Sequence, residues 1–190
     1  MFEKYFVQHI LENPLRYDKW TVQGFGMLRL HLSDQIRLNV WDSALRYSPA
    51  PSMIHDHPWN FVSMIVVGRL WNQRYFRSVD KSKLRTHEEK TIRPGMDFSD
   101  LSDVTQVRLV PAKEEFYANG MQYTQGSWEI HESKCEDGTV TVNARKRVGD
   151  DQAHVFWALG DPWVTALPRP AHSTEILATC ERSLKRWFTV

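Results

Sequence analysis

The sequence has few cysteines and no long apolar run. Cys135 and Cys180 are the only cysteines and do not form a C-x-x-C pair, so a disulfide framework is excluded and a reducing, cytoplasmic compartment is expected. No apolar run approaches the roughly 20 residues of a membrane span, so no membrane partner is expected. The start of the chain lacks the apolar core of a signal peptide, which favours the same compartment.

An excess of charge of one sign is also lacking. The 24 Lys and Arg residues are balanced by 23 Asp and Glu residues, which gives a formal net charge of +1. Nucleic acid is therefore not an expected partner, because nucleic-acid-binding domains usually carry a basic surplus. The local run Arg145, Lys146 and Arg147 is interpreted as a solvated strand end in preference to a phosphate site.

Aromatic residues are plentiful, with 8 Trp, 9 Phe and 6 Tyr in 190 residues. Large rings with a polar edge suit a core, a pocket wall or a subunit contact. A chain of this length fits one domain, so we expect a single domain over 1–190.

The hydrophobic pattern is helical at both ends and alternates between them. Helices are predicted over 2–12 and 173–187, the second capped by Ser173 or Thr174. A polar hairpin and surface loop are expected over 78–106, and Gly68 is expected to separate two strands within 54–76. The remaining predicted strands are 27–32, 36–41, 106–110, 114–118, 121–134, 138–147 and 153–158. This pattern predicts an all-β sandwich or closed barrel over about 20–165.

His55, Asp56 and His57 form an H-x-H pair. On a strand, residues two apart point to the same face, so both imidazoles would reach one metal ion. Alone the pair is weak evidence, because many such pairs bind no metal. A second segment adds Gly120, a turn at Gly126, and His131 at the start of the next strand.

Together these segments resemble the two motifs of the cupin family, H-x-H followed by a carboxylate and a glycine, and G-x5-P-x-G-x2-H-x3-N. His55, His57 and Gly68 match the first, and Gly120 and His131 match the second at the family's interval. The resemblance covers about 25–160 and implies a double-stranded β-helix, the jelly-roll barrel. Four family positions differ: Phe61 occupies the glutamate slot, and the usual proline, second glycine and asparagine are replaced by Gly126, Trp128 and Cys135.

The resemblance implies a metal site of His55, His57 and His131 without the usual glutamate. Among cupins such a site is similar to that of thiol dioxygenases such as cysteine dioxygenase, which implies Fe(II), molecular oxygen and a small polar substrate. Imidazole ligands also suit Zn, Ni, Cu and Mn, so ligand type does not select the metal. Many cupins dimerise, so a homodimer is compatible with the sequence.

Strand parity nominates further residues for the same interior. Trp59, Phe61 and Ser63 are expected in the substrate pocket, and Tyr123 and Glu129 on the paired strand are candidate catalytic residues. Glu129 is a candidate replacement for the missing carboxylate ligand, and a solvated rim glutamate is the favoured alternative. The aromatic residues also suit a core position.

Arg29 and Arg37 lie on the strand faces opposite the leucines. If those faces look inward, the arginines would bind a substrate carboxylate; otherwise they are surface charges. His154 is a competitor for the third ligand position, but the interval from Gly149 is too short for the motif. It is also a candidate catalytic base beside the metal ligands.

Three functions remain open at this stage. The first is a mononuclear non-haem iron dioxygenase. The second is a cupin isomerase, epimerase or hydrolase that uses its metal as a Lewis acid. The third is a binding module without catalytic activity, because a fold does not fix a function.

Overall fold

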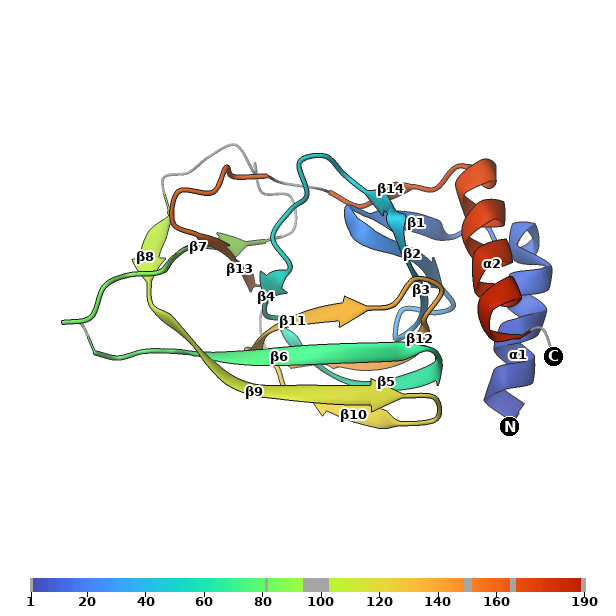
Figure 1. Cartoon of the computed structure of the whole chain (residues 1–190), viewed down its shortest axis with the longest axis horizontal. Helices are drawn as coiled ribbons and strands as arrows, with labels where there is room; N and C mark the ends of the chain where they lie inside the picture. The colour runs from blue at the N-terminus through green and yellow to red at the C-terminus, as the bar shows by residue number, and fades with distance from the viewer. Residues whose placement is uncertain (1, 81, 94–102, 149–151, 165–166, 189–190) are drawn as a thin grey trace.

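The computed structural model describes residues 2–80, 82–93, 103–148, 152–164 and 167–188. Within these ranges the chain is predominantly β, with fourteen strands in two curled seven-stranded sheets and two α-helices beside one of them (Figure 1). A short 3-10 helix, η1 (Pro14–Arg16), follows the first α-helix. This is consistent with the predicted all-β barrel. None of the described helices has the length and apolar character needed to cross a bilayer. Most of the predicted surface loop, 94–102, lies outside the described residues.

Every pairing in the two sheets is antiparallel. The first sheet has the order β10 (Gln122–Gln125), β5 (Trp59–Val67), β12 (Val140–Arg147), β3 (Ile36–Arg46), β2 (Phe25–His31), β1 (Trp20–Gln23) and β14 (Arg169–Pro170). The second has the order β8 (Thr105–Val107), β7 (His87–Ile92), β13 (Ala153–Ala158), β4 (Ile54–His55), β11 (Ile130–Cys135), β6 (Arg69–Arg77) and β9 (Leu109–Ala118).

The two helices cover one face of the first sheet. Helices α1 (Phe2–Glu12) and α2 (Ser173–Trp187) lie together beside β1, β2 and β3 (Figure 1). The main apolar cluster joins both helices to the leucine-bearing face of β2 and β3, through Val7, Ile10, Leu11, Leu28, Leu30, Leu38, Val40, Ile176 and Cys180. The leucines therefore pack beneath the helices, and the opposite face of these strands, which carries the arginines, looks between the two sheets.

Gly68 separates β5 from β6, as predicted. Its φ of +95° lies in the region that glycine tolerates and other residues avoid. A Cβ at this position would stand 2.3 Å from Thr139 Oγ1 and 2.7 Å from Thr139 Cα. Both the backbone conformation and the close approach of Thr139, the residue before β12, require glycine here.

Several boundaries differ from the predictions. The strands predicted at 106–110 and 114–118 are observed as β8, which ends at Val107, and as one longer strand, β9, in which Pro111 is accommodated opposite Tyr75 at an irregularity of the pairing. The segment 121–134 divides into β10 and β11 because Trp128 adopts a positive φ between them. Strand β7 occupies part of the predicted polar hairpin. Helix α2 is capped by His172, not by Ser173 or Thr174, and the His172 amide donates to Glu175 Oε2 at 2.9 Å.

Candidate metal centre

Three histidines from two distant segments meet between the sheets. His55 ends β4, His57 follows it in the link to β5, and His131 lies in β11 directly opposite His55 in the strand register. The ring centroids are 4.6 Å apart for His55 and His57, 4.8 Å for His55 and His131, and 5.3 Å for His57 and His131. The pairing of β4 with β11 therefore brings the two sequence motifs together.

The ring nitrogens are close enough to share one ion. One nitrogen from each ring lies within 4.8 Å of the others, and His57 Nε2 and His131 Nε2 are 3.2 Å apart. Two ligands about 2.1 Å from a metal ion are separated by roughly 3.0–3.4 Å at octahedral or tetrahedral angles. The His57 and His131 pair already meets this requirement, and the His55 ligand atom lies within 4.8 Å of both. Among the described residues, this is the one group of three or more potential ligands.

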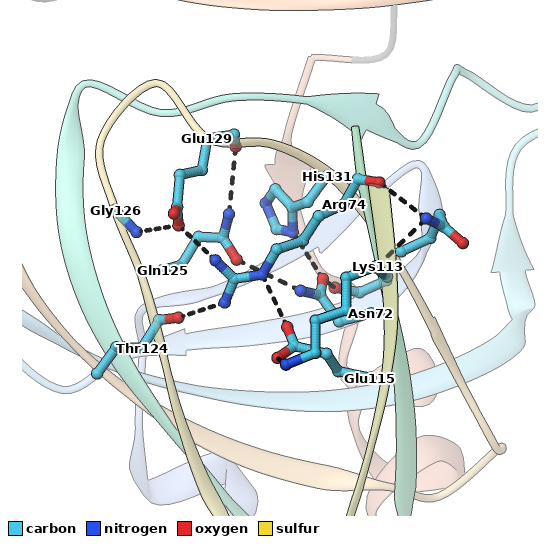
Figure 2. A network of polar contacts seen from close by, with 11 residues as sticks. Asn72, Arg74, Lys113, Glu115, Thr124, Gln125, Gly126, Glu129 and His131 are labelled. Atoms are coloured by element: carbon cyan, nitrogen blue, oxygen red, sulfur yellow. Dashed lines mark hydrogen bonds and ion pairs between the residues drawn. The ribbon is translucent and has the colours of Figure 1, made fainter. Parts of the chain in front are cut away.

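Two of the rings are oriented through their other nitrogen. His55 Nδ1 lies 2.7 Å from the Met53 carbonyl oxygen, and His131 Nδ1 lies 2.9 Å from Asn72 Oδ1 (Figure 2). Both partners are acceptors, so each Nδ1 carries the proton and each Nε2 keeps its lone pair. Metal-binding histidines are oriented in this way in proteins.

The three imidazoles are held in their neutral form. Burial is the main cause that lowers the pKa of His55, and it lowers the pKa of His57 and His131 well below the usual value. The neighbouring histidines act in the same direction on His57 and His131. A neutral imidazole is the form that binds a metal, so these rings need not lose a proton to do so.

A cavity of about 370 Å³ opens beside the histidines and is lined by both sheets. Arg29, Arg37, Trp59, Phe61 and Tyr123 line it, in agreement with the strand-parity argument. The predicted pocket residue Ser63 does not line it, because its hydroxyl is turned to Asn143 and donates to Oδ1 at 2.9 Å. The open question about the arginines is thus answered in favour of the interior.

Phe61 occupies the place where the cupin motif has its glutamate. Its ring centroid is 5.5 Å from that of His57 and 6.2 Å from that of His131. An apolar ring therefore stands beside the ligands where the motif has a carboxylate. The site is a set of three neutral donors.

Glu129 does not replace the missing carboxylate in this structure. Its Oε2 accepts from Arg74 Nη1 at 2.9 Å and from the Gly126 amide at 2.6 Å, outside the cavity (Figure 2). Strand β11 begins at Ile130, so Glu129 belongs to the preceding turn and does not share the inward face of His131. Arg74 also donates to Glu115 Oε2 at 2.7 Å, so the carboxylate is part of an ion-pair network.

His154 does not line the cavity and is bound to Asp56 instead. Its amide donates to Asp56 Oδ1 at 2.6 Å and its Nδ1 lies 2.8 Å from Asp56 Oδ2. Asp56 is buried and stands between His55 and His57 in the chain. His154 therefore anchors the segment that carries two of the three histidines. The residues that precede it in the proposed motif, 149–151, lie outside the described residues.

Trp128 forms the turn of the second motif at a position where glycine is usual. It stands where the cupin motif has its second glycine, and its φ is +67°. Its amide donates to the His57 carbonyl at 2.9 Å. The turn before His131 is thus hydrogen-bonded to the backbone of the first motif.

Sequence reasoning missed Asn72 and misplaced Arg145. Arg145 lines the cavity, while Lys146 and Arg147 are exposed, so the solvated-end interpretation holds for those two alone. Asn143 and Arg145 lie two residues apart on β12 and therefore share one face of the strand. This parity could have predicted from the sequence that Arg145 faces the cavity. Nothing in the sequence marks Asn72, because its role depends on the register of β6 with β11, in which it faces Ser133.

Comparison with known proteins adds no assignment. No family model matches the chain, and no curated protein matches it with a significant score. The conclusions about the site therefore rest on its geometry: a predominantly β chain with three clustered histidines that are compatible with a divalent metal site of the cupin kind.

Proposed function

We propose that this chain is a cupin metalloenzyme of the jelly-roll type that resembles the mononuclear non-haem iron dioxygenases and acts on a small polar molecule. The observation that carries the proposal is the convergence of His55, His57 and His131 on one wall of a 370 Å³ cavity. Three neutral donors on one side of an ion leave its other positions open to the cavity.

The residues around the histidines favour binding of substrate over a purely structural metal. Structural sites are closed by four protein ligands, whereas Phe61 fills the fourth place here with a ring that cannot coordinate. A bound ferrous ion would supply neighbouring positions for substrate and oxygen, and zinc in the same place would supply Lewis acidity.

The protein's own residues would orient the substrate and exclude water. Trp59 and Phe61 provide an apolar wall next to the histidines, at ring distances of 5.1 and 5.5 Å from His57. Tyr123 lines the same cavity, and burial raises its pKa, so its phenol stays protonated and able to donate a hydrogen bond. We assign His154 to positioning Asp56 and its neighbours, because it lies outside the cavity lining.

Metal content and oxygen uptake test the proposal together. Untagged protein purified without chelator should contain about one iron per chain, and His57→Ala and His131→Ala should lose most of it. His87→Ala is the matched control, because His87 lies in β7 and does not line the cavity. Normal iron content in His57→Ala, or a protein that refuses every divalent transition metal, would contradict the site.

Oxygen uptake separates the dioxygenase from the Lewis-acid alternative. Iron-loaded protein should consume oxygen with at least one member of a panel of small acids and thiols, and His57→Ala should not. A zinc-containing protein that consumes no oxygen with iron added would favour the isomerase, epimerase or hydrolase class.

A further inference from the structure

Three arginines share the cavity with the histidines. Arg29 comes from β2, Arg37 from β3 and Arg145 from β12, and all three line the space. No aspartate or glutamate lines it among the residues that the structure describes. Positive charges gathered at a partly desolvated site without an acidic partner repel each other, so this arrangement is suited to an anion that enters from solution.

The strand register explains why the arginines are neighbours. Arg29 pairs with Asn39 and His31 pairs with Arg37 across β2 and β3, so Arg29 and Arg37 are diagonal neighbours on one face. Arg37 pairs with Asn143 across β3 and β12, which makes Arg145 its diagonal neighbour on the other side. Arg37 therefore stands between the other two.

The arginines keep hydrogen-bonding capacity free. Arg29 donates through Nε to Asn39 Oδ1 at 2.9 Å, and Arg145 donates through Nε to the Asp34 carbonyl at 3.1 Å. Arg37 Nε is buried and has no hydrogen-bond partner among the described residues. Burial and then the neighbouring guanidiniums lower the pKa of Arg29 to about 9 and of Arg37 to about 10, and both groups stay charged near neutral pH. Among the described residues, the acid that acts on Arg145 is Asp34, which does not line the cavity.

A single indole ring joins the arginines to the metal centre. The guanidinium carbons of Arg37 and Arg145 lie 5.5 and 4.6 Å from the centroid of the Trp59 ring. The same ring stacks on His57 at 5.1 Å with an interplanar angle of 17°. An anion held by the arginines would thus lie one ring away from the histidines, within the reach of one small molecule.

We propose that Arg29, Arg37 and Arg145 form a phosphate subsite, so that the substrate is a small phosphorylated molecule whose other end reaches His55, His57 and His131. This inference rests on the proposed function and adds its substrate class. A monocarboxylate supplies one charge and two oxygens, which leaves most of the three guanidiniums unpaired. A dianionic phosphate supplies two charges and three free oxygens, and guanidinium forks match that geometry.

Calorimetric titration of the iron-loaded protein at pH 7.5 with three probes tests the subsite. Phenyl phosphate should bind at least tenfold more tightly than benzoate and more tightly than phthalate. Equal affinity for phenyl phosphate and benzoate would overturn the phosphate assignment. A preference for phthalate would replace it with a dicarboxylate, and no saturable binding of any probe would remove the subsite.

Charge-removing variants locate the binding. Arg37→Gln and Arg145→Gln should each weaken phenyl phosphate at least tenfold while the iron content stays at the wild-type level. Arg69→Gln is the matched control, because Arg69 is an exposed arginine outside the cavity, paired with Glu136. Arg145 is less buried than Arg29 and Arg37, so its variant remains informative if replacement of a more buried arginine impairs folding.

The same samples separate failure of the inference from failure of the proposed function. Unchanged phenyl phosphate binding in both arginine variants, together with its loss on removal of iron, would mean that the ion alone holds the phosphate and would overturn the subsite. Phenyl phosphate binding that depends on the arginines in a protein that binds no metal would keep the subsite and refute the metalloenzyme.

Discussion

Asn72 accepts a hydrogen bond from His131 at 2.9 Å in a fully buried position, where the amide oxygen also accepts from Ser133 Oγ at 3.1 Å. The amide nitrogen of Asn72 points to Gln125 Oε1 at 3.4 Å, so the network continues behind the ligand (Figure 2). Asn72 thus fixes both the tautomer and the ring plane of the third histidine.

Replacement of Asn72 should weaken metal binding without abolishing it. We expect Asn72→Ala to lower the affinity for Co²⁺ or Zn²⁺ by about 10–100-fold, because the His131 ring loses the partner that orients it. Competitive titration with a chromogenic chelator measures this. Ser133→Ala removes the other donor to the same oxygen and should change the affinity little; equal losses in both variants would indicate general disruption of the network.

Acid should destabilise the metal-free protein below the usual histidine pKa. The lowered pKa values of His55, His57 and His131 mean that the unfolded chain takes up protons near pH 6.5 that the folded chain does not. The stability contribution is complete above that pH and is lost as the pH falls toward the folded pKa values. Each imidazole should remove up to about 1.4 kcal/mol per pH unit from the free energy of unfolding.

Urea unfolding between pH 7.5 and 5.0 measures this dependence. His31 and His87 also have a lowered pKa, so the comparison that isolates the cluster is wild type against His57→Ala. The free energy of unfolding of His57→Ala should fall less steeply with decreasing pH than that of the wild type, by the contribution of about one histidine. Parallel slopes would show that His57 is protonated as readily in the folded chain as in the unfolded one.

The turn at Trp128 should prefer glycine to alanine. Both Trp128→Gly and Trp128→Ala remove the indole, and they differ in the penalty for a φ of +67°. Glycine normally destabilises a folded chain relative to alanine, but here we expect Trp128→Gly to be the more stable variant by about 1 kcal/mol. Thermal unfolding of the two proteins checks the sign, and a more stable alanine variant would mean that the backbone relaxes out of this conformation.

The sequence predicted the three-histidine cluster because its signal is local. The H-x-H spacing and the interval from Gly120 to His131 depend on residues close together in the chain, and the structure brings these two segments together. Gly68 was predictable for the same reason. Strand β9 and the cap at His172 were not, because pairing with β6 and the reach of the Glu175 side chain decide those boundaries.

Prediction of the pocket lining requires knowing which face of β2 and β3 points inward, and the hydrophobic pattern does not contain this information. Alternation of Leu28 and Leu30 with Arg29 shows that the two faces differ, but either face could be the inner one. The helices decide it by covering the leucines, and they lie at the far ends of the chain. Glu129 was misplaced because strand β11 begins one residue later than the parity prediction requires, at Ile130. The homodimer, the cytoplasmic compartment and the choice of iron stay predictions.

The two faces of β2 and β3 have different neighbours, the helices on one side and the cavity on the other, so substitutions on the two faces should have different effects. Even-numbered positions such as Leu28 and Leu38 contact the helices, whereas odd-numbered positions such as Arg29 and Arg37 contact the cavity. Substitutions at the even-numbered positions would alter thermal stability, and those at the odd-numbered positions would alter ligand preference. A library confined to the odd-numbered set could therefore search for new specificities on an intact scaffold.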